Sequence, residues 1–203
     1  MIAVVGYGMG NVQSVVNALD HIGAPNAVTE DPRALSKADR ILLPGVGAFR
    51  RAMERLEKTG FAAALRAGAA AGTPILGICL GMQLLATTGT EFGETPGLGL
   101  VPGRVERIPA GEAWRLPHMG WNDLDLRRDD PLLAGLDGQG DTACYFVHSY
   151  HLVPDDEGAI SATCDYGTPV TATISAGSVY GAQFHPEKSQ AVGLAILANF
   201  AAL

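Results

Sequence analysis

The first half of the chain alternates between short apolar runs and longer segments in which apolar residues recur at helical spacing. The runs are apolar over most of their length, as is typical of strands buried on both faces of a sheet. They are residues 2–6, 26–30, 40–44 and 73–78. Residues 11–23 place five apolar residues on one helical face: Val12, Val15, Val16, Leu19 and Ile22. Asn11 and Gly23 suit the start and the stop of that helix.

The second half changes character from about Gly103. Its apolar segments are joined by Gly, Asp and Pro turns, which favour antiparallel strands and hairpins. These segments are residues 103–108, 143–153, 159–167, 169–177 and 178–186. A last helix is expected over residues 189–202. The pattern predicts an α/β fold, a flavodoxin-like open and mostly parallel sheet flanked by helices, with added antiparallel strands in the C-terminal half. One domain over residues 1–203 is expected.

Composition narrows the possible settings of this fold. With 47% hydrophobic and 17% charged residues, a chain of 203 residues can close one core. Its apolar runs are shorter than the roughly 20 residues needed to span a bilayer, and the N-terminus lacks a basic segment typical of a signal peptide. We therefore expect a cytoplasmic protein that does not bind membranes. A net charge of −7 without a Lys/Arg cluster disfavours nucleic acid as a partner.

Cys79 lies in the sequence GICLG, between two glycines at the end of a predicted strand. This G-x-C-x-G pattern is typical of a nucleophile on a strained turn between a strand and a helix. The turn is expected to lift the thiol out of the core and to place it at a helix N-terminus, where thiolate is favoured over thiol. Cys144 and Cys164 lack such surroundings and are interpreted as core cysteines.

A second group follows the last predicted strand, in GAQFHPEKS. Side chains two residues apart in an extended strand share a face, so His185 and Glu187 are expected to point the same way. A carboxylate in this position orients an imidazole. Together with Cys79 these residues form the nucleophile, base and orienting group that acyl transfer requires.

The Gly-rich turn in LLPGVGAF follows the strand at residues 40–44. Acyl transfer needs backbone N–H groups aimed at a developing oxyanion, and glycines let such groups approach closely. We expect one donor from the turn at Val46 and Gly47, and another from the N–H of Leu80. The sequence GYGMGN at residues 6–11 lacks the third glycine of a dinucleotide fingerprint. His148 and His151 have no third ligand at a recognisable spacing, so neither a metal nor a cofactor is expected.

These motifs resemble those of class I glutamine amidotransferases, over nearly the whole chain. Within that superfamily, five segments resemble the glutaminase subunits of imidazole glycerol phosphate synthases: YGMGNVQSV, PGVGAF, PHMGWN, YFVHSYH and HPEKS. The resemblance implies that glutamine is hydrolysed to glutamate and ammonia in histidine biosynthesis. The ammonia would pass to a (β/α)8-barrel cyclase subunit in a heterodimer, where a ribonucleotide, PRFAR, is converted to imidazole glycerol phosphate and AICAR.

The resemblance also implies roles for individual residues. Those expected to bind the substrate glutamine are Gly45, Gln83, Glu91, Ser149 and Tyr150. Those expected at the partner interface or along the ammonia passage are His118, Met119, Trp121, Asn122, Tyr145 and Lys188. From the two glycines that flank Val46, we also expect the turn from Gly45 to Gly47 to rest with a peptide N–H turned away from the oxyanion position, and to flip when the cyclase docks with its ribonucleotide bound.

Two positions depart from the family pattern. Gly6 stands where Asp is common, which removes a carboxylate expected near the oxyanion turn, and Ser149 stands where Thr is common and keeps the hydroxyl. Two alternatives stay open. The chain could be the glutaminase of another synthase, of the anthranilate, GMP or pyridoxal phosphate type, or a non-enzymatic flavodoxin-like module in which Cys79 is a core residue.

Overall fold

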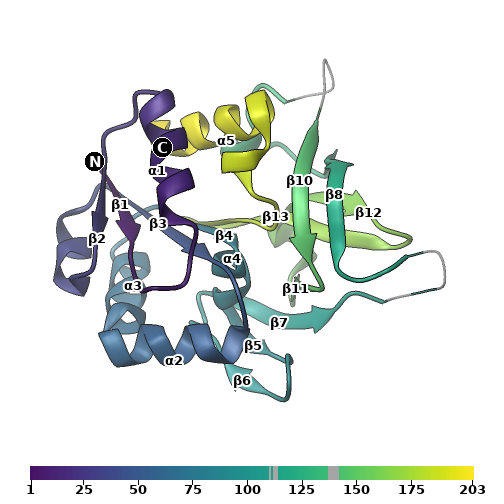
Figure 1. The fold of residues 1–203 in the computed structure, drawn as a ribbon, viewed down its shortest axis with the longest axis horizontal. Coiled ribbons are helices and arrows are strands. Elements are labelled where there is room, and N and C mark those ends of the chain that lie inside the picture. Colours follow the sequence, from purple (N-terminus) through teal and green to yellow (C-terminus); the bar gives the residue numbers. More distant parts are fainter. Residues whose placement is uncertain (110, 112–113, 137–141) are drawn as a thin grey trace.

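The computed structural model describes residues 1–109, 111, 114–136 and 142–203, which are arranged around an eight-stranded sheet (Figure 1). Its strands are β1 (Ile2–Val5), β2 (Asn26–Thr29), β3 (Arg40–Gly45), β4 (Ile75–Cys79), β9 (Asp125–Leu126), β12 (Ile160–Asp165), β13 (Pro169–Ala176) and β14 (Val179–Ala182). They lie in the order β2-β1-β3-β4-β14-β13-β12-β9. Neighbours from β2 to β14 are parallel, and those from β14 to β9 are antiparallel.

Two smaller sheets complete the C-terminal half. One has the order β11-β7-β5-β6 and the other pairs β10 with β8. Their strands are β5 (Ala86–Gly89), β6 (Thr95–Pro96), β7 (Val101–Arg107), β8 (His118–Asp123), β10 (Ala143–His148) and β11 (Tyr150–Pro154). The α-helices are α1 (Val12–His21), α2 (Phe49–Thr59), α3 (Phe61–Ala70), α4 (Leu80–Leu84) and α5 (Gln190–Ala202). The 3-10 helices are η1 (Pro32–Lys37), η2 (Pro131–Leu133), η3 (Glu157–Ala159) and η4 (Pro186–Lys188).

Helices cover both faces of the parallel part of the large sheet. Ile2 and Val4 of β1 pack into the core cluster that contains the apolar faces of α1 and α5. Ala3 and Val5 point the opposite way and belong to the cluster formed with α2 and α3. Figure 1 shows these two helix pairs on opposite sides of the sheet. The continuous apolar runs of β1, β3 and β4 thus reflect burial on both faces.

Three expectations about strands differ from the structure. The strand at residues 26–30 is not buried on both faces, because β2 lies at the sheet edge and half its positions are exposed. The run at residues 143–153 is not one strand, since it divides at Ser149 into β10 and β11, which join different sheets. The C-terminal half is also not wholly antiparallel: β14 pairs in parallel with β4, and β5 pairs in parallel with β7.

The sheet brings distant segments together at the carboxyl ends of its parallel strands. Gly45, the last residue of β3, is the register partner of Cys79 at the end of β4. Ala182 ends β14 beside Ile78, so the segment leading to His185 leaves the sheet next to the cysteine. Open α/β sheets bind ligands at this edge. Among the described residues, no helix is long and apolar enough to cross a membrane.

Candidate active site

Cys79 lies on a strained turn where β4 meets α4. Its φ and ψ angles are 54° and −113°, and a positive φ is uncommon for a residue with a side chain. Two glycines allow the turn to pack closely. A Cβ on Gly77 would come within 2.6 Å of the Gly81 carbonyl oxygen, and one on Gly81 would overlap the carbonyl of Leu43. The G-x-C-x-G sequence therefore folds as the strained elbow that the pattern predicts.

The Cys79 side chain is less accessible than predicted. The residue is only 7% exposed and packs within a core cluster, so the expectation that the elbow lifts it clear of the core is wrong. The residue nevertheless borders a cavity of about 690 Å³. Gln183 Nε2 lies 3.9 Å from its sulfur. A ligand in this cavity can therefore reach the thiol.

His185 and Glu187 contact each other as the sequence predicts, but through a different backbone geometry. His185 Nδ1 lies 2.8 Å from Glu187 Oε1, and the side chains are 3% and 1% exposed. The strand ends at Ala182, and His185 is the N-cap of η4 rather than part of an extended strand. The tight turn, with Pro186 at its first position, therefore brings the carboxylate to the imidazole.

The electrostatic environment of His185 favours its protonated form. Burial alone lowers its pKa, but hydrogen bonds to Cys79 and Glu187, together with their negative charges, outweigh burial and raise the pKa to about 9. Imidazolium is therefore the dominant form near pH 7. The charged ring therefore lies beside the Cys79 sulfur with a proton to donate.

The cavity gathers most of the residues that were singled out in the sequence. Besides Cys79 and His185, its lining includes Val46, Gly47, Leu80, Gln83, Glu91, Ser149 and Tyr150. Gly45 does not line it. A Cβ on Gly45 would come within 2.7 Å of the Gly81 backbone nitrogen and 3.0 Å of the Tyr7 hydroxyl, so Gly45 packs behind the wall. The residue next in sequence, Val46, is 41% exposed at the cavity.

The side chains of two of these lining residues already form hydrogen bonds within the protein. Gln83 Nε2 donates to the Tyr150 carbonyl at 2.8 Å and to Gln183 Oε1 at 3.0 Å. Glu91 Oε2 accepts a 2.7 Å hydrogen bond from the backbone N–H of Phe49, at the start of α2. Both side chains are therefore held in place before a ligand binds, and one oxygen of Glu91 is committed to the helix end.

The cavity also contains residues that the sequence did not single out for it. They are Phe92, Arg107, Pro117, Val147 and His148. Arg107 is the register partner of Tyr150 across β7 and β11, a long-range pairing that no local pattern reveals. The sequence pattern suggests His148 only as a metal ligand. Its position directly before Ser149 was the available signal that it could line the same wall.

A side chain at position 6, where Gly6 replaces the common Asp, would not point toward the turn at Val46. A Cβ built there has Val28, Thr29 and Glu30 as its nearest neighbours, at 3.1 to 3.4 Å. The expectation that an Asp at this position would lie near the turn at Val46 is therefore wrong. A side chain would begin at the end of β2, where Glu30 already supplies a carboxylate.

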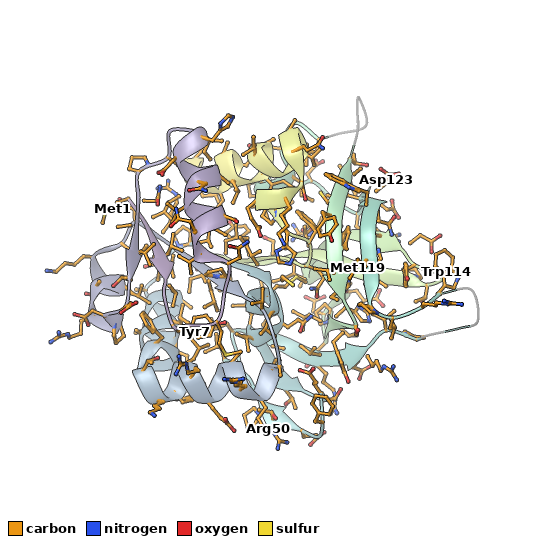
Figure 2. All side chains as sticks on the ribbon, viewed as in Figure 1. Met1, Tyr7, Arg50, Trp114, Met119 and Asp123 are labelled. Atoms are coloured by element: carbon orange, nitrogen blue, oxygen red, sulfur yellow. The ribbon has the colours of Figure 1, made fainter. Side chains whose placement is uncertain are left out.

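One face of β8 presents apolar side chains to solvent. Met119 is 61% exposed and Trp121 is 50% exposed (Figure 2, in which Met119 is labelled). The Trp121 ring lies edge-on to Tyr145 with centroids 6.1 Å apart, and Lys188 Nζ lies 5.7 Å from the Tyr145 ring centroid. These four residues, from β8, β10 and η4, form an aromatic and cationic cluster. The last residues of β10, Val147 and His148, line the cavity.

His118 does not belong to this exposed cluster. It is 3% exposed and points to the opposite face of β8 from Met119, so a direct contact with a partner protein does not fit its position. Asn122 is partly exposed, and its side-chain amide bonds inward to the Asp165 carbonyl at 2.8 Å. Alternation along β8 thus separates two sets of side chains that the sequence analysis placed together.

Comparison with known proteins places nearly the whole chain in the family that its sequence motifs resemble. The family "Glutamine amidotransferase class-I" matches residues 3–202. The imidazole glycerol phosphate synthase subunit HisH of Syntrophotalea carbinolica is 47% identical over 98% of this chain and 98% of its own. The subunit of the same name from Streptococcus gordonii is 50% identical over 98% of this chain and 95% of its own.

Solved structures with low sequence identity share the fold. A crystal structure of a glutamine amidotransferase aligns with a TM-score of 0.77 at 21% identity, over 100% of both chains. The glutaminase domain of Trypanosoma brucei CTPS, solved with bound acivicin, aligns with a TM-score of 0.68 at 19% identity, over 99% of this chain and 93% of that one. The sheet and helices described above are therefore a recurring architecture.

Proposed function

This chain belongs to the class-I glutamine amidotransferase family, and on that premise we propose that it is the glutaminase subunit of an imidazole glycerol phosphate synthase. It hydrolyses glutamine and passes the ammonia to a cyclase subunit, as part of histidine biosynthesis. The observation that carries the proposal is that Cys79, on a strained elbow, shares a cavity with His185, which is paired with buried Glu187.

The first half of the proposed reaction releases ammonia. The Cys79 thiolate attacks the side-chain carboxamide carbon of glutamine, and the carbonyl electron pair moves to oxygen. The intermediate then collapses, the carbon–nitrogen bond breaks, and His185 gives its proton to the departing nitrogen. The raised pKa of His185, about 9, supports this role because the ring holds a proton before the substrate binds.

The second half restores the enzyme. Neutral His185 takes a proton from water, the resulting hydroxide adds to the glutamyl thioester carbon, and the carbon–sulfur bond breaks. The product leaves as the γ-carboxylic acid, which loses its proton to water to become glutamate, while thiolate and imidazolium are regenerated. Glu187 keeps the ring oriented through its 2.8 Å contact with Nδ1, which leaves the other ring nitrogen for the proton transfers.

Backbone N–H groups of Val46 and Leu80 are the proposed oxyanion donors. Support comes from the β3–β4 register, which places Gly45 opposite Cys79, and from the presence of Val46, Gly47 and Leu80 in the cavity wall. Gly47 has a φ of 101°, a conformation that glycine adopts readily. We propose that the turn from Gly45 to Gly47 reorients when the partner docks, so that Val46 N–H points to the oxyanion only in the complex.

The glutamine itself is proposed to bind along the opposite wall. Glu91 offers a carboxylate to the ammonium group of the amino acid, while Gln83, Ser149 and Tyr150 offer amide, hydroxyl and backbone groups. Gly45 contributes by its lack of a side chain behind the turn. A cavity that offers a carboxylate together with fixed polar groups suits a small zwitterion.

The cyclase, a (β/α)8 barrel in our proposal, is expected to dock on the cluster of Met119, Trp121, Tyr145 and Lys188. Aromatic residues and methionine are enriched at protein interfaces. Asn122 is proposed to lie at the edge of this contact and His118 behind it. Docking there would bring the partner to the side of the molecule where ammonia leaves, and the heterodimer is proposed to work in the cytoplasm.

The test is glutamate release from glutamine by this chain, alone and with its cyclase and bound ribonucleotide. Strong stimulation that Cys79→Ala abolishes is the expected result. Cys164→Ala is the matched control, because Cys164 is buried, lies outside the cavity, and has its pKa raised to about 12 by burial and by Asp165. Glutaminase activity that depends on Cys79 but ignores the cyclase would assign the chain to another synthase. No activity under any condition would leave Cys79 as a core residue.

A further inference from the structure

Two buried histidines near the cavity, His118 and His148, have no part in the reaction described above. They are 3% and 6% exposed and belong to a continuous chain of hydrogen bonds. His118 Nδ1 lies 3.0 Å from His148 Nε2, and His148 Nδ1 lies 2.9 Å from the carbonyl oxygen of Tyr150. At the other end, Asn122 Nδ2 lies 3.2 Å from His118 Nε2. The chain thus runs from β8 to the cavity wall.

The inner end of the chain determines where the protons lie. The carbonyl oxygen of Tyr150 can only accept, so His148 Nδ1 must carry the hydrogen. A neutral imidazole has one N–H, which leaves His148 Nε2 as an acceptor. His118 Nδ1 must therefore be the donor to it, and His118 Nε2 is left without a proton.

The outer end requires the same direction independently. One end of the Asn122 side-chain amide faces the Asp165 carbonyl, which only accepts, and the other end faces the backbone N–H of Asp123, which only donates. The amide orientation is therefore fixed, with its NH₂ group toward His118. That group donates to His118 Nε2, so both ends of the chain specify one pair of tautomers.

This arrangement holds only while both rings are neutral. A second proton on His148 would turn an N–H toward the N–H of His118, and a second proton on His118 would turn one toward the Asn122 amide hydrogens. Burial lowers the pKa of His118 to about 4. Burial also lowers the pKa of His148, to about 3, and outweighs the hydrogen bond to Tyr150. Both rings are therefore neutral across the physiological pH range, and this row of hydrogen bonds keeps its direction.

The inner end of the chain is part of the cavity. The Tyr150 carbonyl accepts from His148 and also from Gln83 Nε2, and all three of these residues line the cavity with Ser149. We propose that His118 and His148 are positioning residues, which fix the Ser149–Tyr150 backbone and, through it, Gln83 for the binding of glutamine. The identity of the ligand rests on the proposed function, whereas the hydrogen-bond chain does not.

The direction of the chain can be tested without any activity measurement. In the ¹⁵N-labelled protein, the NMR shifts of the ring nitrogens distinguish a protonated from an unprotonated nitrogen. We expect both His118 and His148 to carry their proton on Nδ1 and to stay neutral from pH 6 to pH 8. An Nε2–H tautomer in either ring, or a positive charge on either ring within that range, would overturn the proposal.

The effect on the cavity is tested by kinetics in the complex with saturating cyclase and ribonucleotide. His118→Leu leaves His148 Nε2 without its donor, and the loss of one buried hydrogen bond predicts a KM for glutamine raised about three- to tenfold, with a smaller effect on kcat. His118→Asn keeps an N–H group near the position of Nδ1 and is expected to restore most of the KM. An unchanged KM in His118→Leu would overturn the proposal.

A matched control separates positioning from general destabilisation. His151 is 9% exposed and accepts a hydrogen bond from the Thr171 N–H. It lies outside the row of hydrogen bonds through His118 and His148. His151→Leu is expected to lower the thermal unfolding temperature without raising KM, and an equal rise in KM would count against the proposal. His118 also stacks on Tyr166, with ring centroids 4.1 Å apart. If His118→Leu does not fold for this reason, the NMR result decides.

The outcome for the proposed function is separate. A wild-type complex that does not hydrolyse glutamine would refute the proposed function and leave the tautomer test standing.

Discussion

Gly45 and Cys79 are register partners at the carboxyl ends of β3 and β4. The turn that follows Gly45 therefore begins next to the proposed nucleophile, and Leu80, which carries the other proposed donor, follows Cys79 directly in the sequence. Two backbone segments far apart in sequence can thus supply donors to a single oxyanion.

Val46→Pro removes the N–H that we assign to the oxyanion. Loss of one such donor typically lowers kcat by about 10²- to 10³-fold, so we expect cyclase-stimulated glutamate release to fall by that much. Val46 is 41% exposed, and the substitution should leave the fold and the complex intact. Circular dichroism and the affinity for the cyclase check both conditions, and steady-state glutamate release gives the result.

Val46→Ala is the matched control, because it shortens the side chain and keeps the N–H. It is expected to retain most of the stimulated rate. If Val46→Pro turned over glutamine as fast as Val46→Ala in an intact complex, the donor would have to be another group, and the proposed reorientation of the turn would lose its basis.

The Tyr7 hydroxyl is buried beneath this turn without a hydrogen-bond partner among the described residues. Burial and the nearby Cys79 raise the pKa of Tyr7, so the group keeps its proton. Since an unsatisfied buried hydroxyl is costly, Tyr7→Phe is expected to raise the free energy of unfolding by about 1 kcal/mol. Urea denaturation measures the change.

Tyr166→Phe is expected to change the free energy of unfolding in the opposite direction. The Tyr166 hydroxyl donates to the Arg115 carbonyl at 2.6 Å, so its removal is expected to cost about 1 kcal/mol. Equal destabilisation by both substitutions would mean that the Tyr7 hydroxyl makes a favourable interaction in solution, and the interpretation of Tyr7 would be wrong.

His185 predicts a pH dependence of stability. Its pKa is about 9 in the folded protein and near 6.5 when unfolded. The folded state therefore binds the proton more tightly, so this contribution to stability is fully present below pH 6.5 and is lost as the pH rises through 9. It amounts to at most about 3 kcal/mol. Unfolding free energies between pH 6 and pH 9.5 should fall accordingly.

Glu187→Gln tests the source of that dependence. Without the carboxylate, the pKa of His185 should fall toward its ordinary value, and the decline in stability should become shallower. Glutamate release should fall by about 10²- to 10⁴-fold, because the imidazole loses its orienting charge. Glu54→Gln, an exposed carboxylate on α2, is the control. Equal pH profiles for the wild type and Glu187→Gln would exclude Glu187 as a cause of the raised pKa.

The parallel half of the fold and the elbow were predictable from the sequence because their signals are local. Continuous apolar runs such as β1 and β4 reflect burial on both faces, and two glycines around Cys79 reflect the close packing that the turn requires. The family resemblance then indicated most of the cavity. The apolar runs and the elbow depend on residues that are near each other in the chain.

The features that the sequence did not reveal depend on long-range pairing. The split at Ser149 follows from two strands joining different sheets, and Arg107 enters the cavity only because β7 pairs with β11. The two buried rings, His118 and His148, meet because β8 pairs with β10 in one particular register, in which the two residues are direct partners. A shift of one residue in either strand would have put the two side chains on opposite faces.

Trp121 is expected to be a main contact for the cyclase. It is 50% exposed and lies edge-on to Tyr145, which also carries Lys188 over its ring. Truncating a central aromatic residue of an interface commonly costs about 2 kcal/mol or more, which is roughly a 30-fold loss of affinity. Trp121→Ala should therefore weaken cyclase binding by about that factor in calorimetry. Val28→Ala, which shortens a 48% exposed apolar side chain on edge strand β2, should bind like the wild type. Equal affinities for the two variants would place the docking surface elsewhere on the molecule.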